Sequence, residues 1–240
     1  MERLTAAGPV LVHFFDFGEL NSVRALPYLK AWHERYAPAG LTVIGVDTPR
    51  HPFSEDPAAV AEAVARLEIP YPVLADANRE AWTDYGCHGW PSLFLWSQGG
   101  ALRWYHFGEG AYAASEEAIR KQLDGPLDLP PPLDPVPLGA EVAAPTPELL
   151  PGGSEGAPWR AGPEAAQLDL DFAAGGAFAT LDGAGSVEIE LDGEPLPALA
   201  VDHPGLYPLT PEDPHAEHRL ALRPDPGVLV YSISFSAAAR

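Results

Sequence analysis

Nine prolines fall within residues 126–151, and three of them are consecutive at 130–132. Neither a helix nor a central β-strand tolerates that density, because proline lacks a backbone N–H and fixes its φ angle. The segment is therefore expected to be an extended, polyproline-like connector. The sequence thus predicts a first domain over residues 1–124, a proline-rich linker over 125–152, and a second domain over 153–240.

Strand and helix patterns alternate in the first half. Apolar runs and their flanking turns predict strands at 10–15, 41–46, 73–74, 92–96 and 101–107. Apolar residues at helical spacing and N-terminal signals predict helices at 23–36, from Pro57 to about Leu67, at 78–85 and at 115–123. This order predicts an α/β domain with a mixed central sheet and helices on both faces.

Helical periodicity disappears after the linker. Strands are expected at 177–181, 186–191, 218–222 and 228–235. Turns are expected at 182–183, 192–193 and 226–227, where glycine follows aspartate or proline. The pattern predicts an all-β sandwich or jelly-roll-like domain.

The chain is strongly acidic, with 14 basic and 34 acidic residues and a net charge of −20. Residues 1–125 contribute −6 and residues 126–240 contribute −14. Such a surface repels nucleic acid and anionic lipid, so we interpret it as solubilising, with a cationic partner as the alternative. No apolar run approaches the roughly 20 residues of a membrane span, and the N-terminus lacks a secretory signal pattern. The sequence as written predicts a soluble cytoplasmic protein, or an envelope (periplasmic) one if an upstream segment has been removed.

Two stretches resemble the thioredoxin superfamily. Residues 14–22 (FFDFGELNS) stand where that family ends its first central strand and places its Cys-x-x-Cys motif, and Pro27 stands where it kinks the following helix. Residues 85–95 (YGCHGWPSLFL) are similar to the family's cis-proline loop and the strand after it. The extra helix before the third strand resembles the TlpA-type and AhpC/TSA-like redoxin branches. The resemblance implies a thioredoxin fold over about residues 1–124.

A more specific resemblance is to DipZ-type cytochrome c biogenesis proteins. Residues 26–32 (LPYLKAW), 43–49 (VIGVDTP) and 106–112 (HFGEGAY) resemble that group's first helix, second strand and last strand. Residues 191–193 and 206–209 resemble its C-terminal, carbohydrate-binding-module-like β domain. The resemblance implies a thiol–disulfide oxidoreductase family and no bound cofactor.

The sequence departs from this family at the catalytic motif. Glu19 and Ser22 hold the two cysteine positions, and Cys87 is the single cysteine of the chain. Thiol–disulfide exchange needs an attacking thiolate and a second thiol that resolves the mixed disulfide. Dithiol activity is therefore predicted to be absent.

Glu19 and Ser22 are expected at the N-terminus of the first helix, where a carboxylate and a hydroxyl can cap it. The alternative is that they shape a groove, formed with Phe17, Trp90 and Pro91, that receives an extended protein segment. The Trp90–Pro91 bond is a candidate cis peptide. The leading hypothesis is a non-catalytic binding or scaffold protein.

Cys87 supports a second hypothesis, a single-cysteine enzyme acting on peroxide or a glutathione adduct. His88 would favour its thiolate, whereas Glu19 would oppose it. The alternative is a packed, structural cysteine.

Two further sites are conceivable in the second domain. Trp159, Tyr207 and Tyr231 could stack on a carbohydrate, although aromatic residues of a sandwich also serve as core. His215 and His218, with Asp213 and Glu217, could bind a metal, although a solvated polar loop explains them equally. We predict no metal site.

Overall fold

The computed structural model of the chain describes residues 3–123, 142–162, 166–212 and 214–239. Backbone contacts divide the chain into two compact units. Unit 1 comprises Met1–Pro49 and Ser54–Pro137, and unit 2 comprises Arg50–Phe53 and Leu138–Arg240. Most of the predicted linker lies outside the described residues. Its described part belongs to unit 2, where β6 (Val142–Ala143) pairs with β15 (Ala238–Ala239).

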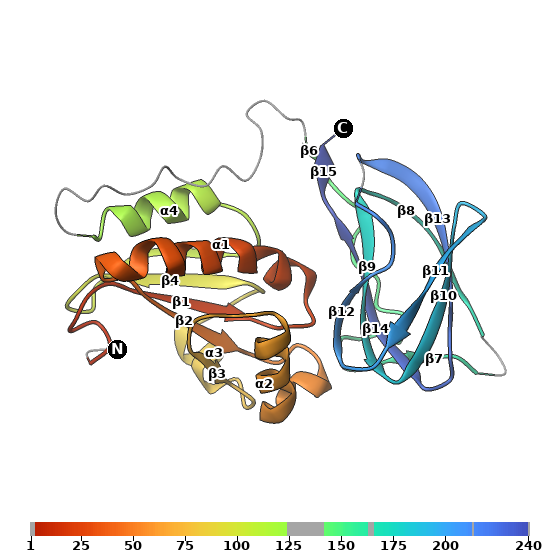
Figure 1. The fold of residues 1–240 in the computed structure, drawn as a ribbon, viewed down its shortest axis with the longest axis horizontal. Helices are drawn as coiled ribbons and strands as arrows, with labels where there is room; N and C mark the ends of the chain where they lie inside the picture. Colours follow the sequence, from red (N-terminus) through yellow and green to blue (C-terminus); the bar gives the residue numbers. More distant parts are fainter. Residues whose placement is uncertain (1–2, 124–141, 163–165, 213, 240) are drawn as a thin grey trace. The chain divides into compact units, whose positions relative to one another are not determined.

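A five-stranded mixed sheet forms the centre of unit 1 (Figure 1). β1 (Val10–Phe15) runs parallel to β2 (Thr42–Asp47) and antiparallel to β4 (Ser92–Trp96). β3 (Val73–Ala75) and β5 (Leu102–Phe107) form the two edges. The helices are α1 (Leu20–Tyr36), α2 (Pro57–Arg66), α3 (Glu80–Tyr85) and α4 (Tyr112–Arg120), with 3₁₀ turns at Ala37–Ala39 and Pro52–Glu55. The predicted α/β thioredoxin fold is confirmed.

Helices cover both faces of this sheet (Figure 1). α1 and α4 lie side by side on one face, where the rings of Tyr28 and Tyr112 stack with centroids 3.7 Å apart. α3 packs on the other face through side chains that include Trp82, which lies edge-on to Phe14. Every residue of β1 is buried, as its unbroken apolar run predicts. α1 begins three residues earlier than its periodicity predicts, because the N-cap is Glu19.

Unit 2 contains two four-stranded sheets, ordered β11-β10-β13-β8 and β12-β9-β14-β7. Their strands are β7 (Trp159–Arg160), β8 (Leu168–Ala174), β9 (Gly176–Gly183), β10 (Gly185–Leu191), β11 (Glu194–Val201), β12 (Gly205–Pro208), β13 (Ala216–Pro224) and β14 (Val228–Ser236). Leu220 and Leu222 of one sheet share a core with Leu181 and Val230 of the other. The all-β architecture is confirmed, although β7, β8, β11 and β12 were not predicted.

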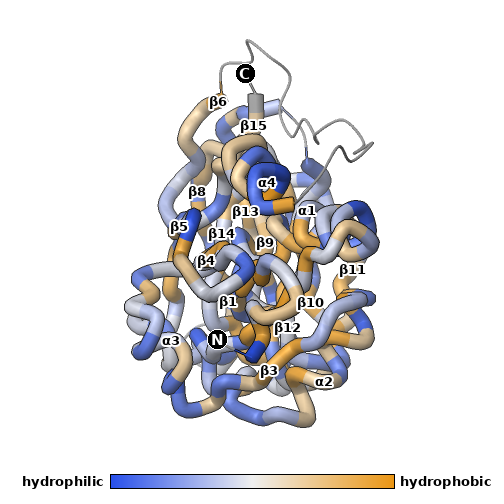
Figure 2. The backbone as a smooth tube through the Cα atoms, turned by 90° about the vertical axis from the view of Figure 1, so that its left-hand side faces the viewer, coloured by the Kyte–Doolittle hydropathy of each residue, from blue (hydrophilic) through white to orange (hydrophobic). Residues whose placement is uncertain are grey.

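The hydropathy of the backbone follows this arrangement. Figure 2 shows hydrophobic colouring mainly along the strands and hydrophilic colouring mainly in peripheral turns and helices. Among the described residues, no helix is long and apolar enough to cross a membrane.

The centre of β1 holds a buried histidine. His13 is 0% exposed, and neither ring nitrogen has a hydrogen-bond partner among the described residues. Its ring stacks on Phe15 with centroids 5.0 Å apart. Burial lowers the pKa of His13 to about 3, because the imidazolium would lose its hydration without gaining a partner.

We expect His13→Leu to increase the free energy of unfolding of unit 1 by about 1–3 kcal/mol at pH 7.5, because it removes unsatisfied buried polar atoms. The folded-state pKa lies below the unfolded value of ~6.5, so the wild type loses stability as the pH falls below ~6.5. The gain should therefore be larger at pH 5. Urea unfolding followed by fluorescence measures it, since five of the six tryptophans lie in residues 32–104. An equal or smaller gain at pH 5 would contradict a neutral, desolvated His13.

Candidate functional site

A short turn connects β1 to α1 at the position of the expected site. The Asp16 backbone carbonyl accepts from the Glu19 N–H at 3.1 Å, and the Asp16 Oδ1 accepts from the Gly18 N–H at 2.7 Å. Ser22 closes the turn, because its Oγ accepts from the Asp16 N–H at 3.2 Å. The helix start and the strand end are therefore held together by polar contacts.

Glu19 caps α1 with its own carboxylate. Oε1 accepts from the Asn21 N–H at 3.0 Å and Oε2 from the Ser22 N–H at 2.6 Å. The side chain is only 5% exposed. The capping interpretation of Glu19 is confirmed. A negative group thus already occupies the place at the helix N-terminus where an anion is most favoured.

Two buried carboxyl groups lie beneath this turn, and the sequence analysis missed them as a pair. Asp16 is 0% exposed and its Oδ2 accepts from the Ser54 hydroxyl at 2.6 Å. Asp47 is 1% exposed and its Oδ2 accepts from the Phe17 N–H at 3.2 Å. Burial, reinforced by the charge of Asp16, raises the pKa of Asp47 well above its ordinary value. Burial and the nearby Asp16 thus both oppose ionisation of Asp47.

A third aspartate follows β3. Asp76 accepts from the N–H groups of Ala81 and Trp82, both at 3.0 Å, and from the Thr48 hydroxyl at 3.1 Å. The three neighbouring parallel strands therefore each end at an aspartate that accepts hydrogen bonds from backbone N–H groups, which for Asp76 belong to the first turn of α3. Carboxyl ends of parallel strands meet at one edge of a sheet, and that signal could have been read from the sequence.

Trp90 lies on the loop before β4. The Trp90–Pro91 peptide bond is cis, and the pairing of Phe14 with Ser92 places Pro91 next to the end of β1. The indole Nε1 donates to the Thr48 carbonyl at 3.0 Å, and the ring stacks on Trp82 with centroids 4.2 Å apart. The Arg79 guanidinium lies 5.4 Å from the ring centroid. These contacts hold the indole in one orientation.

The predicted groove residues differ in exposure. Phe17, Glu19, Ser22 and Pro91 are buried, and only Trp90 is partly exposed. Of these five residues, Trp90 alone is accessible to a partner.

Cys87 is poorly suited to thiolate chemistry. Its side chain is 7% exposed and packs against the core on the α3 face. The pKa of the Cys87 thiol is raised to about 12, mainly by burial; a hydrogen bond with Ser92 lowers it, and the charge of Asp76 adds a smaller increase. His88 lies against Phe107 instead, with ring centroids 5.4 Å apart. These contacts fit a structural cysteine.

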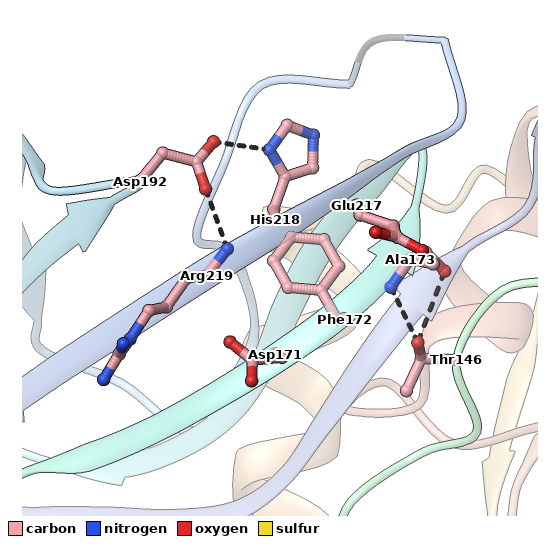
Figure 3. A pocket seen from close by; sticks show the side chains of 8 residues that line it. All are labelled: Thr146, Asp171, Phe172, Ala173, Asp192, Glu217, His218 and Arg219. Atoms are coloured by element: carbon pink, nitrogen blue, oxygen red, sulfur yellow. Dashed lines mark hydrogen bonds and ion pairs between the residues drawn. The ribbon is translucent and has the colours of Figure 1, made fainter.

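A polar groove of about 530 Å³ lies along the β8–β13 pair in unit 2 (Figure 3). The His218 Nδ1 lies 2.7 Å from Asp192 Oδ2, and the Arg219 N–H donates to Asp192 Oδ1 at 2.8 Å. A second hollow continues past Arg219 toward β10. Residues lining the two are Thr146, Gln167, Asp169, Asp171, Phe172, Ala173, Glu190, Asp192, Gly193, Glu217, His218, Arg219 and Ala221.

The other predicted features of unit 2 do not assemble as binding sites. Tyr207 is 7% exposed and Tyr231 is 5% exposed, so they do not form an open stacking platform with Trp159. His218 pairs with Asp192 rather than with His215 or Glu217. Asp213 lies outside the described residues. Within the described ranges, no three histidine, cysteine, aspartate or glutamate side chains gather as metal ligands.

Comparison with known proteins relates part of the chain to DipZ. No protein-family model matches the chain. A stretch of 115 residues, 48% of the chain, is 38% identical to protein DipZ of Mycobacterium bovis and of Mycobacterium tuberculosis. A stretch of 114 residues is 29% identical to the chloroplastic protein SUPPRESSOR OF QUENCHING 1 of Arabidopsis thaliana. The matches span 16% of DipZ and 11% of the plant protein.

Similar solved structures are thiol–disulfide proteins. A thiol-disulfide isomerase from Corynebacterium glutamicum matches with a TM-score of 0.48 and 20% identity, over 52% of this chain and 87% of that protein. A thioredoxin-family thiol:disulfide interchange protein from Chlorobium tepidum matches with a TM-score of 0.43 and 18% identity, over 51% of this chain and 85% of that protein.

Proposed function

We propose that this chain, which has a thioredoxin-like region and is homologous to DipZ over about half its length, is a non-catalytic protein that binds an extended segment of another protein. The proposal is supported by the residues at the positions where the resemblance implies a dithiol. These residues are Glu19 and Ser22, and both are buried and hydrogen-bonded to backbone N–H groups.

The chemistry of these groups supports the proposal. A disulfide is cleaved by a thiolate that forms a mixed disulfide, which a second thiol then resolves. A carboxylate and a hydroxyl form no such intermediate. Because burial raises the pKa of the Cys87 thiol to about 12, too little thiolate is present at pH 7 for exchange.

Trp90 supports the binding role. Large aromatic side chains dominate the energy of many protein interfaces, especially when their orientation is fixed before binding. Thr48, Trp82 and Arg79 fix the indole through a hydrogen bond, a stacked ring and a cation–π contact. We propose that the partner segment lies across this indole beside Pro91.

In an insulin reduction assay with dithiothreitol, we expect the wild type to give the rate of buffer alone, because it lacks the exchanging thiols. In a Cys87→Ser background, Glu19→Cys together with Ser22→Cys should raise the rate several-fold, since two thiols then stand at the helix N-terminus. The Glu19→Cys single variant is the control and should stay inactive. Measurable turnover by the wild type would refute the non-catalytic proposal.

We expect the wild type to bind fluorescein-labelled, S-carboxymethylated insulin B chain, an extended probe without free thiols, in a fluorescence anisotropy titration. Trp90→Ala should weaken binding at least tenfold, because it removes the aromatic anchor. Leu74→Ala, at an exposed residue of β3, is the matched control and should bind as the wild type does. Equal affinity of the wild type and Trp90→Ala would contradict a site at Trp90.

The groove on unit 2 favours a second binding activity, and we propose that it takes a saccharide. Side chains from two neighbouring strands supply donors and acceptors side by side: Asp171 stands directly across from Arg219 in the β8–β13 register. Neighbouring hydroxyl groups of a sugar ring can pair with a carboxylate and a guanidinium together. This site differs from the aromatic platform of Trp159, Tyr207 and Tyr231 that the sequence left open as an alternative.

We expect a glycan array probed with the full chain to show selective binding to at least one saccharide. Arg219→Ala should weaken binding of that saccharide about tenfold or more in calorimetry, because a charge-assisted hydrogen bond is lost. Arg160→Ala removes an exposed arginine of the other sheet and should leave affinity unchanged. An array without binding, or equal losses in both variants, would argue against this site.

A further inference from the structure

β5 forms an open edge of the unit 1 sheet. It pairs with β4 on one side and with no strand on the other among the described residues. The Gly108 N–H donates to the Pro91 carbonyl at 2.7 Å, which fixes the alternation of hydrogen-bonded pairs along the two strands. Tyr105 and Phe107 consequently direct their backbone N–H and C=O groups away from β4. Such an edge is a template for another strand.

The side chains at this edge form an aromatic surface on one face. Tyr105 is 57% exposed, and its ring lies 5.5 Å from that of Phe107, which in turn contacts Phe94 at 5.8 Å between centroids. Leu102 at the start of the strand is 43% exposed. The opposite face of β5 is covered, because the Trp104 Nε1 donates to Ser115 of α4 at 3.1 Å. The open surface is therefore narrow and apolar.

The distribution of charge along the chain indicates which partner can pair with the β5 edge. The chain has 34 acidic residues, yet none lies between Tyr85 and Gly108, and Arg103 is the only arginine or lysine there. Two copies that each carry a charge of −20 repel one another wherever acidic surfaces meet. Because β5 carries no acidic residue, two copies of the chain can approach each other there with the least electrostatic repulsion. A cationic partner would find better complements on the acidic surfaces elsewhere.

We infer that β5 is the contact between two copies of this chain, which pair their β5 strands antiparallel about a two-fold axis perpendicular to the sheet. Such pairing is self-complementary and continues the five-stranded sheet into its counterpart. The axis keeps each side chain on its own face, so the two Tyr105 rings lie on the same face of the joined sheet. Main-chain hydrogen bonds supply the pairing, and the aromatic side chains exclude water from it.

We expect sedimentation equilibrium of the full chain to show a monomer–dimer equilibrium in the micromolar range that strengthens at least threefold between 50 and 500 mM NaCl, because salt screens the repulsion of like charges. Tyr105→Asp should make the chain monomeric throughout. Leu74→Asp places the same charge at the opposite edge of the sheet, on a residue 55% exposed, and should leave the dimer intact.

Hydrogen exchange of the wild type supplies a test that does not depend on folding of a variant. The amides of Tyr105 and Phe107 should exchange more slowly at 500 μM than at 5 μM protein, whereas the Leu74 amide should not change. A monomer at all concentrations, a dimer that survives Tyr105→Asp, or one lost equally in Leu74→Asp would overturn the inference. None of these results bears on insulin reduction or segment binding, so the proposed function is tested separately.

Discussion

The hydrogen bonds accepted by three buried aspartates determine the geometry of unit 1 around the site. Asp16, Asp47 and Asp76 each stand at the carboxyl end of a parallel strand and bind N–H groups of the loop that follows or adjoins it. Loops at this edge would otherwise leave backbone donors unsatisfied at positions with little access to water. The carboxylates satisfy those donors and so fix the turn before α1 and the start of α3.

Further hydrogen bonds of the same network order the start of α1 and the loop that carries Trp90. Glu19 satisfies two N–H groups at the start of α1, and Ser22 links the helix back to Asp16. Thr48 bridges the network to Trp90, because its hydroxyl donates to Asp76 while its carbonyl accepts from the indole. The partly exposed Trp90 is thereby connected through Thr48 to the buried Asp76.

Sequence patterns predicted the strands that are buried along their whole length. They missed features that depend on a strand's position in the sheet or on contacts between distant residues. The apolar runs of β1 and β4 gave their bounds correctly, because both strands lie inside the sheet. β11 contains Pro195 and Pro197, which oppose a strand assignment, yet β11 is an edge strand where prolines are tolerated. The pairing of Asp16 with Asp47 was missed because 31 positions separate them, and only the register of β1 and β2 brings them together.

The uneven charge of the chain follows from which strand positions meet water. In β10 the exposed Glu188 lies between the buried Val187 and Ile189, and in β8 the exposed Asp169 and Asp171 alternate with less exposed apolar residues, so the sandwich acquires negative charge without disturbing its core. The hairpin of β4 and β5 carries no acidic residue, and the exposed residues of β5 are Leu102, Arg103 and Tyr105. Like charges oppose contact between two copies of the chain, so this hairpin is a place where such contact meets less repulsion. In the proposed dimer, the aromatic side chains of β5 supply the attraction there.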